Sequence, residues 1–340
     1  MIKLDLYCYL HNNGRVREVT NSMKNNRVCI LGGTGFDGRH LTARLTAMGI
    51  ECRIPTRYPE AHRALRLNGP VELVPASRFD QEQLRNLFRG CDAVINLIGI
   101  LNQGGGNSFQ HLHVELPDLI IDACKNARVT RLLHMSALNA STTGEVSEYL
   151  RSKGEAQNRV LTNSSSHGGL NVTSFGPSVI FGHDDSFFNR FAGLLRLLPG
   201  PFPLACPNSR FAPVYVGDVA RAFALSLDNR KSWKRHYELC GPRSFTLREL
   251  VQYTARQMGL NKPIIGLNDS LSRLQGHVLG MLPGKPFSYD NYLSLQIDSV
   301  CSQDGLAELG IEATDIDAVV PYYLGPRAER SRFLKLRSLA

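Results

Sequence analysis

The sequence predicts an α/β fold in which a doubly wound parallel sheet is followed by a smaller mixed lobe. Three observations predict it: short apolar runs alternate with helical patterns from Arg27 to Phe175, a glycine-rich turn follows the first run, and the alternation loosens beyond Pro177. Repeated β/α alternation with right-handed crossovers places helices on both faces of a parallel sheet. A chain of 340 residues with 43% hydrophobic residues can bury such a core.

The expected elements follow from apolar spacing, turn residues and segment length. Strands are expected at Arg27–Leu31, Glu51–Pro55, Val71–Val74, Ala93–Ile98, Arg131–Met135 and Val172–Phe175. Helices are expected between them at His40–Met48, Gln81–Phe88, Leu116–Asn126 and Glu148–Leu161. Beyond Pro177, amphipathic helices are expected at Ser186–Leu198, Val216–Ser226, Thr246–Met258 and Ser270–Leu282.

This pattern divides the chain into four parts. Residues 1–26 form an expected loose extension, within which Met23 is an alternative start. Residues 27–182 form the expected sheet domain, and residues 183–325 form the smaller lobe, some of whose segments return to the sheet. Residues 326–340 form a basic tail that interleaves arginine and lysine with leucine and phenylalanine. Such a tail can lie on anionic lipid, and the alternative is ordinary packing against the neighbouring lobe.

Composition narrows the functional classes. The formal charge of +9 favours anionic partners, but the basic residues are not interleaved with aromatics as in a nucleic-acid-binding module. The eight cysteines lack a CxxC pair, so we expect reduced core residues in a cytosol-like compartment and no metal site. No apolar run reaches the roughly 18 residues that cross a bilayer. We therefore expect a cytoplasmic protein, with the cytoplasmic face of the membrane as an alternative.

The strongest local motif is Gly32-Gly33-Thr34-Gly35-Phe36-Asp37-Gly38, which follows an apolar strand and opens a helix. Glycines at this spacing allow a tight turn and close approach of the backbone to a pyrophosphate at the helix amino terminus. The motif predicts a Rossmann-type dinucleotide site formed by Gly32, Thr34, Gly35, Phe36 and Gly38. A glycine turn without a ligand is the alternative.

The next strand ends in Thr56-Arg57 rather than in an acidic residue. An acid at this place bonds the ribose 2′-hydroxyl of NAD, whereas an arginine can pair with the 2′-phosphate of NADP. Thr56 and Arg57 therefore favour NADP(H) over NAD(H), unless Arg57 simply faces water. Asn96 and Gly99 end the fourth strand, where a doubly wound sheet opens its ligand crevice.

Tyr149 and Lys153 stand four residues apart on one expected helix. A nearby ammonium lowers the pKa of a phenol, which would suit Tyr149 to proton exchange with a carbonyl or alcohol during hydride transfer. Ser136 is the candidate third catalytic group, and a hydrogen bond to cofactor or backbone is the alternative role for its hydroxyl. His111, His113 and His183 have no partner spacing and stay unassigned.

The helix expected near Phe187–Leu198 carries Phe187, Phe188 and Phe191 between arginines. This helix could line a cleft for a lipid-like substrate, or it could pack against the neighbouring lobe.

The landmarks together resemble the short-chain dehydrogenase/reductase superfamily, in its atypical branch of extended members. Within this branch they are most similar to the family of the complex I alpha subcomplex subunit 9 accessory subunit and its bacterial relatives. The segments that carry the resemblance are 94–99, 138–140, 149–153, 177–182, 213–219 and 305–314.

This resemblance implies a tightly held NADP(H), with Tyr149 and Lys153 at the nicotinamide ribose and the turn from Pro177 through Ile180 beside the nicotinamide. It implies either an oxidoreductase acting on a carbonyl, alcohol or quinone-like substrate, or a non-catalytic accessory protein of complex I or ubiquinone biosynthesis. The chain departs from the family at Asp37, Ser77 and Gly176, where an aliphatic residue, an acid and an arginine are usual.

Overall fold

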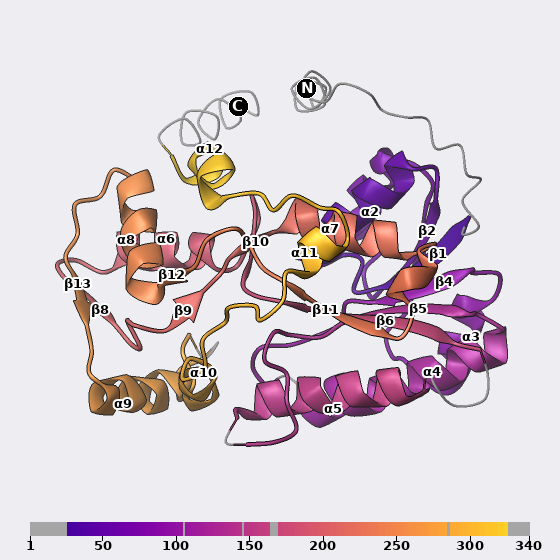
Figure 1. Ribbon diagram of the computed structural model, residues 1–340, viewed down its shortest axis with the longest axis horizontal. Helices are drawn as coiled ribbons and strands as arrows, with labels where there is room; N and C mark the ends of the chain where they lie inside the picture. Colours follow the sequence, from indigo (N-terminus) through magenta and orange to yellow (C-terminus); the bar gives the residue numbers. More distant parts are fainter. Residues whose placement is uncertain (1–25, 105, 145, 164–168, 284–285, 326–340) are drawn as a thin grey trace.

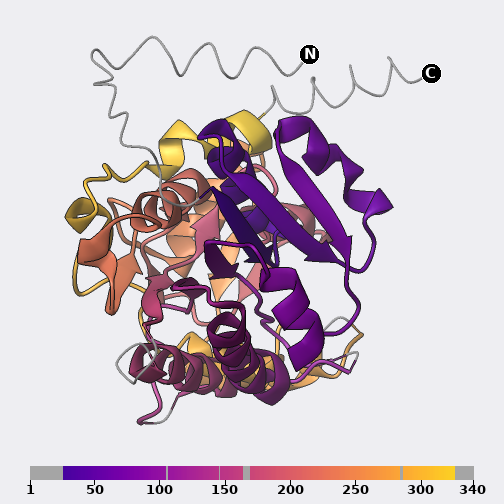
Figure 2. The ribbon, with the colours of Figure 1, turned by 90° about the vertical axis from the view of Figure 1, so that its right-hand side faces the viewer.

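The computed structural model describes residues 26–104, 106–144, 146–163, 169–283 and 286–325. The expected tail at 326–340 and nearly all of the extension at 1–26 lie outside the described residues. Within them, a seven-stranded parallel sheet has the order β11-β6-β5-β4-β1-β2-β3. The doubly wound α/β fold predicted from the sequence is confirmed, and helices cover both faces of the sheet (Figures 1 and 2).

The central strands of this sheet have the expected positions, with ends shifted by at most two residues. They are β1 (Arg27–Leu31), β2 (Glu51–Thr56), β3 (Val71–Pro75), β4 (Ala93–Asn96), β5 (Arg131–Met135) and β6 (Asn171–Pro177). The seventh strand, β11 (Arg235–Leu239), comes from the second half of the chain and pairs with β6. Residues 235–239 therefore return to the sheet, while the domain division at residue 182 stays a prediction.

The two faces of the sheet are covered by different helices. Val28 and Ile30 of β1 pack into one buried cluster with α2 (Phe36–Ala47) and α7 (Val216–Ser226). Cys29 and Leu31 point into the other cluster, with α3 (Gln81–Phe88) and α4 (Leu116–Ala127). This alternation is typical of a strand that is buried on both faces. The helix α5 (Glu148–Asn163) lies beside α4 (Figure 1).

The remaining elements form short sheets and helices beside this core. Two irregular helices flank it early in the chain, namely a 3-10 helix at Glu60–Asn68 and a π-helical turn at Gln110–Glu115 that runs into α4. The later strands are β7 (Ile180–Phe181), β8 (Phe202–Leu204), β9 (Arg210–Phe211), β10 (Val214–Tyr215), β12 (Phe245–Thr246) and β13 (Ile264–Gly266). The later helices are α6 (Phe188–Leu197), α8 (Leu247–Gln257), α9 (Asp269–Gly280), α10 (Tyr289–Ser294), α11 (Gly305–Glu308) and α12 (Val320–Leu324), with 3-10 turns at Arg230–Ser232 and Ile316–Ala318.

The aromatic side chains of α6 and its amino terminus pack into the core of the second lobe. Phe188 is fully buried against Phe181 and Tyr253, and Phe187 and Phe191 join a neighbouring cluster with Phe202. Of the two alternatives stated for this helix, these contacts support packing against the neighbouring lobe, because its apolar face finds partners on β7, β8 and α8.

Candidate functional site

The strand order reverses between β1 and β4, and this is where the glycine turn lies. A parallel sheet opens a ligand crevice outside the carboxyl ends of its strands at such a point. Gly32 follows β1 with a φ of +80°, and a Cβ added there would lie 3.2 Å from the carbonyl carbon of Leu97, just after β4. The two strand ends are therefore packed together at the floor of the crevice.

The first turn of α2 approaches this glycine turn too closely for any side chain at Gly38. A Cβ at Gly38 would overlap the carbonyl oxygen of Gly32 and lie 2.5 Å from the Cα of Gly33. The amide of Gly35 donates to the carbonyl of Gly32 at 3.0 Å, which closes the turn between β1 and α2. The helix amino terminus, and the positive end of its dipole, therefore faces the crevice.

Thr34 and Phe36 lie within this turn. The carbonyl of Thr34 accepts a hydrogen bond from the Arg39 guanidinium at 3.2 Å, and the Phe36 ring meets the His40 ring edge to face at 5.4 Å. A Cβ at Gly182 would lie 3.2 Å from the Phe36 ring, so Phe36 separates the glycine turn from the segment after β7.

At the end of β2, Thr56 and Arg57 differ in exposure. Thr56 is buried, and its hydroxyl accepts a hydrogen bond from the amide of Tyr58 at 3.3 Å. Arg57 is exposed, with its guanidinium carbon 6.0 Å from the centre of the Tyr58 ring. Among the described residues Arg57 makes no ion pair, so its charge is available to a ligand at this edge of the crevice.

Asn96 is buried and holds the end of β4 in place. Its amide nitrogen meets Nδ1 of His134 on β5 at 3.2 Å, and its side-chain oxygen accepts from the amide of Ile98 at 3.1 Å. Burial lowers the pKa of His134 to about 3, so that ring is neutral. Gly99, three residues on, is so close to α5 that an added Cβ would lie 2.9 Å from Nζ of Lys153.

Lys153 and Tyr149 lie on α5 and face this crevice. The ammonium of Lys153 donates to the carbonyl of Met135 at 3.1 Å, and burial lowers its pKa to about 8, against the opposing effect of Asp37. Burial, and after it the charge of Asp37, raises the pKa of Tyr149 to about 12. The prediction of a lowered phenol pKa is therefore wrong, since burial and the charge of Asp37 both disfavour the phenolate.

Asp37 is a half-buried acid in the first turn of α2. Its Oδ1 is buried without a hydrogen-bond partner among the described residues. Burial raises the pKa of this carboxyl from 3.8 to about 6, while its own backbone amide, Lys153 and Arg39 act in the opposite direction. The sequence singled out this residue as a departure, and the structure adds that its charge acts on Tyr149 and Lys153.

Ser136 directly follows β5, and its amide continues the sheet by donating to the carbonyl of Phe175 at 2.7 Å. Its side-chain oxygen is buried without a hydrogen-bond partner in the described part of the chain. The backbone bond expected as an alternative role for the hydroxyl is therefore not made. The hydroxyl is left available for another partner.

The sequence missed the role of His113. Its Nε2 accepts from the amide of Ile100 at 3.0 Å, and its Nδ1 meets the hydroxyl of Ser152 at 2.8 Å. Burial, and then Lys153, lowers its pKa to about 3, so the ring is neutral. Its ring centre lies 5.8 Å from that of Tyr149. His113 thus ties the loop after Gly99 to α5, and no sequence spacing could have indicated this.

The turn after β6 forms the far wall of the crevice. The carbonyl of Pro177 accepts from the amide of Leu138 at 3.0 Å, and Ile180 of β7 pairs with Val214 of β10. The hydroxyl of Ser178 donates to the carbonyl of Ser299 at 2.7 Å.

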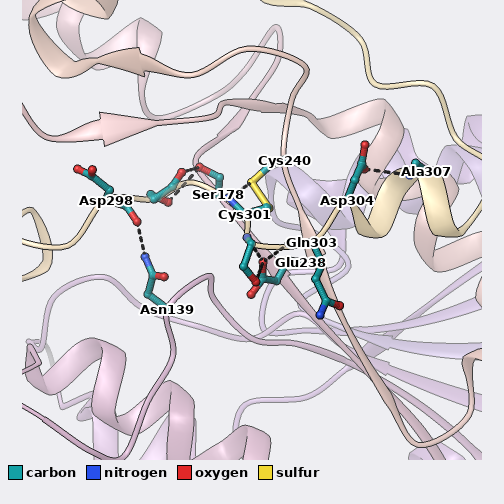
Figure 3. The surroundings of a disulfide bond; sticks show 11 residues. Asn139, Ser178, Glu238, Cys240, Asp298, Cys301, Gln303, Asp304 and Ala307 are labelled. Atoms are coloured by element: carbon teal, nitrogen blue, oxygen red, sulfur yellow. Dashed lines mark hydrogen bonds between the residues drawn. A yellow bond between two sulfur atoms is a disulfide. The ribbon is translucent and has the colours of Figure 1, made fainter.

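The segment that contains Ser299 returns from α10 to the sheet and is fixed to several elements (Figure 3). Asn139 donates to the carbonyl of Asp298 at 2.8 Å, and Glu238 accepts from the amide of Ser302 at 2.6 Å. A disulfide joins Cys240, just after β11, to Cys301. The expectation that all eight cysteines are reduced is therefore wrong for this pair. Sequence could not find the pair, because its spacing matches no motif.

Two further observations concern metal sites and membrane-spanning helices. No group of three or more histidine, cysteine or acidic side chains in the described ranges is arranged to hold a metal ion. None of the helices in the same ranges is both long enough and apolar enough to cross a bilayer.

The comparisons with known proteins agree with this architecture. The model of the NAD dependent epimerase/dehydratase family matches residues 28–240. The chain is 29% identical to the mitochondrial NADH dehydrogenase (ubiquinone) 1 alpha subcomplex subunit 9 of Rattus norvegicus over 297 residues, which cover 85% of this chain and 77% of that protein. It is 25% identical to a ceramide reductase of Caulobacter vibrioides, over 71% of this chain and 74% of that one.

Among solved structures, MoeE5 in complex with UDP-glucuronic acid and NAD has a TM-score of 0.68 and 17% identity, over 90% of this chain and 99% of that chain. This likeness concerns the fold. The resemblance drawn from the sequence motifs is confirmed at the level of the superfamily. Since the family model spans more than half of its length, this protein belongs to the NAD dependent epimerase/dehydratase family.

Proposed function

We propose that the protein binds a nicotinamide dinucleotide, NADP(H) in preference to NAD(H), and exchanges hydride between it and a carbonyl, alcohol or quinone-like substrate. The observation that carries the proposal is the position of the Lys153 ammonium, which lies against the backbone of Gly99 in the crevice that the glycine turn opens. A buried cation and an open helix amino terminus in one crevice suit a ligand with both ribose hydroxyls and phosphates.

The candidate residues can be assigned to the successive parts of this dinucleotide. Gly32, Thr34, Gly35, Phe36 and Gly38 would hold the pyrophosphate, with backbone amides at the start of α2 as donors. Thr56 would hold the adenosine ribose, and Arg57, which makes no ion pair with the described residues, would hold its 2′-phosphate. The nicotinamide half would meet Asn96, Gly99, Ser136, Lys153, Pro177 and Ile180. When bound, the dinucleotide supplies or accepts the hydride.

Tyr149 would act as the acid in the reducing direction. With a pKa of about 12 its hydroxyl is protonated at neutral pH, so it can donate a proton to a carbonyl oxygen as the carbonyl carbon accepts hydride. Lys153, with a pKa of about 8, stays mostly charged and would stabilise the phenolate that remains. Ser136, with its unpaired hydroxyl, is the third candidate.

The test begins with native mass spectrometry of freshly purified protein, which weighs any retained dinucleotide. Candidate quinones are then added while the absorbance of bound reduced nicotinamide is followed. We expect oxidation in the wild type and a loss of about 100-fold or more in rate for Tyr149→Phe, as is common when an acid catalyst is removed. Tyr322→Phe, at an exposed tyrosine of α12, is the matched control. Equal rates in all three proteins would contradict the role of Tyr149, and a protein without dinucleotide would contradict the whole proposal.

A second function is favoured by the relative named as a complex I subunit. In this function the dinucleotide stabilises a non-catalytic accessory or assembly protein of respiratory complex I or of ubiquinone biosynthesis. A retained dinucleotide that stays inert, together with full complementation of a deletion strain by Tyr149→Phe, would favour it over catalysis.

Peripheral membrane binding remains a separate proposal, and it depends on the basic tail from Arg327 to Leu339. Deleting this tail is expected to abolish co-sedimentation with anionic liposomes. Unchanged co-sedimentation would remove the membrane from the proposed function.

A further inference from the structure

Helix α9 (Asp269–Gly280) turns its small residues inward and its large apolar residues outward. Ser272 and Gly276 are buried, and a Cβ added at Gly276 would lie 3.3 Å from the carbonyl oxygen of Ser288. On the other side, Leu271, Leu274, Val278, Met281 and Leu282 are exposed at intervals of one helical turn; we call them the α9 stripe. A surface helix normally buries its apolar stripe, so this inversion indicates a contact with something other than the described residues.

A cavity of about 370 Å³ lies beside the stripe, between α9, the start of α10 and the start of α5. This volume lies within the range of small-molecule sites. Figure 1 shows α10 between α9 and the left-hand end of α5, and α10 contacts both helices. The lining residues are Asn102, Gln103, Phe109, Glu148, Gly276, His277, Gly280, Met281, Ser288, Tyr289 and Asp290. Met281, which is 83% exposed, belongs to both the cavity and the α9 stripe.

The inner end of the cavity adjoins the proposed acid Tyr149. The carboxylate of Asp290 accepts from the amides of Glu148 at 2.7 Å and Tyr149 at 3.2 Å, which caps α5 from the second lobe. The Phe109 ring lines the cavity, and its centre lies 6.0 Å from that of Tyr149. Asp290 and Phe109 therefore line the cavity and also contact Tyr149, the first at its backbone amide and the second at its ring.

The lining of the cavity disfavours an anionic occupant. It carries the carboxylates of Glu148 and Asp290 and contains neither lysine nor arginine among the described residues. A phosphate or diphosphate would meet two acids there, and the Arg273 guanidinium nearby already packs on the Tyr289 ring, 5.6 Å from its centre. The His277 and Tyr289 rings stack at 4.4 Å and, with Phe109 and Met281, form flat apolar walls.

We propose that this cavity receives an uncharged substrate bearing a carbonyl or alcohol and a long hydrocarbon chain, and that the chain leaves past Met281 and lies along the α9 stripe. The proposal rests on the proposed function for the role of Tyr149. It separates this protein from members of the fold that hold nucleotide-linked sugars, since the described lining of this cavity offers a diphosphate no lysine or arginine. The substrate class is therefore a neutral lipid.

The test measures binding, not turnover, on the full-length protein with its retained dinucleotide. Isothermal titration calorimetry compares three ligands: a dimethoxy-methyl-benzoquinone without an alkyl chain, its decyl-chain analogue and UDP-glucose. We expect the decyl chain to improve affinity at least tenfold, because each buried methylene contributes favourably, and we expect UDP-glucose not to bind. In the double variant Leu271→Asp with Leu274→Asp, at two exposed positions of the α9 stripe that do not line the cavity, the chain should lose its advantage while binding of the quinone without the chain stays unchanged.

The control is Leu67→Asp, which places a negative charge at an exposed leucine outside the cavity and the α9 stripe, in the 3-10 helix after β2. Equal affinity for both quinones, binding of UDP-glucose, or the same result for the double variant and the control would overturn the proposal. It would also be overturned if the double variant lost binding to phosphatidylcholine vesicles but kept the chain advantage, since the stripe would then be a membrane surface. Chain-dependent binding without nicotinamide oxidation would leave this inference standing and remove the hydride transfer.

Discussion

The two walls of the crevice are built by different means. The cofactor wall consists of the glycine turn, the ends of β1, β2 and β4, and α5, and it depends on close backbone approaches such as that of Gly38 to the glycine turn. The opposite wall consists of the return segment near Ser299 together with α9 and α10. It is held by bonds between distant residues: Asn139 and Asp298 are 159 positions apart, and Glu148 and Asp290 are 142 apart.

This difference indicates how strongly each wall should respond to a single substitution. Close backbone packing tolerates no added atom, so single substitutions on the cofactor wall should have large effects. The opposite wall has several redundant attachments, including the hydrogen bonds of Ser178 and Glu238 and the Cys240–Cys301 disulfide. Losing one of them should cost stability and leave the dinucleotide in place.

The largest effect is expected from Gly38→Ala. The added methyl group would overlap the carbonyl of Gly32, so the start of α2 must move away from the turn. We expect protein purified without dinucleotide and with a clearly lower melting temperature, measured by native mass spectrometry and calorimetry. Gly193→Ala, inside α6 with open space around the new Cβ, is the control and should be neutral or slightly stabilising. Normal dinucleotide content in Gly38→Ala would show that the cofactor wall is less rigid than its packing indicates.

The disulfide of the opposite wall should matter next. Replacing Cys240 and Cys301 together by serine is expected to lower the free energy of unfolding by about 2 to 4 kcal/mol, the usual range for a native disulfide. Retained dinucleotide is expected, because neither cysteine contacts the glycine turn. Chemical denaturation of both proteins with and without reductant provides the measurement; reductant should affect only the wild type. Free thiols at both positions in non-reducing peptide mapping would contradict the bond itself.

Arg57→Ala tests selectivity at the outer end of the cofactor wall. Hydrogen bonds to a charged group contribute about 1.5 to 3 kcal/mol, so affinity for NADP(H) should fall about 10- to 100-fold while affinity for NAD(H) is unchanged. Arg256→Ala, an exposed arginine at the end of α8, controls for the loss of positive charge. A parallel loss for both dinucleotides, measured by fluorescence titration, would mean that Arg57 does not distinguish them.

The smallest effect concerns Asp37 and pH. Its pKa of about 6 lies above the 3.8 of an unperturbed aspartate, so its neutral form is favoured by folding. The corresponding stability is fully present below 3.8 and is lost as the pH rises through about 6. Because the ionised carboxylate also repels a pyrophosphate, dinucleotide affinity should fall several-fold over the same range.

Asp37→Asn should remove this pH dependence and bind the dinucleotide as tightly above pH 6 as below it. Asp184→Asn, at an exposed acid paired with Arg39, should leave the dependence intact. Titrations of all three proteins across this range decide the matter, and a pH profile in Asp37→Asn equal to that of the wild type would assign the dependence to another group.

The amphipathic helices illustrate the limit of what sequence can predict. The patterns at Phe187–Leu198 and Ser270–Leu282 both place apolar side chains at helical spacing, and both helices form. Their apolar faces differ in exposure to solvent: Phe188 is buried, whereas Leu274 is 56% exposed. Spacing determines that a face exists, but whether another element covers it depends on residues far away in the chain.

The sequence by itself determined the sheet, the glycine turn and the helix that carries Tyr149 and Lys153, because local periodicity, turn residues and backbone sterics act over a few residues. The tertiary structure alone decided that β11 completes the sheet and that Cys240 meets Cys301. It also decided that His113 bonds Ser152 beside Tyr149 and that Asp290 accepts from the amide of Tyr149. It also reversed the expected pKa shift of Tyr149, since burial and a distant carboxylate act together only once the chain has folded.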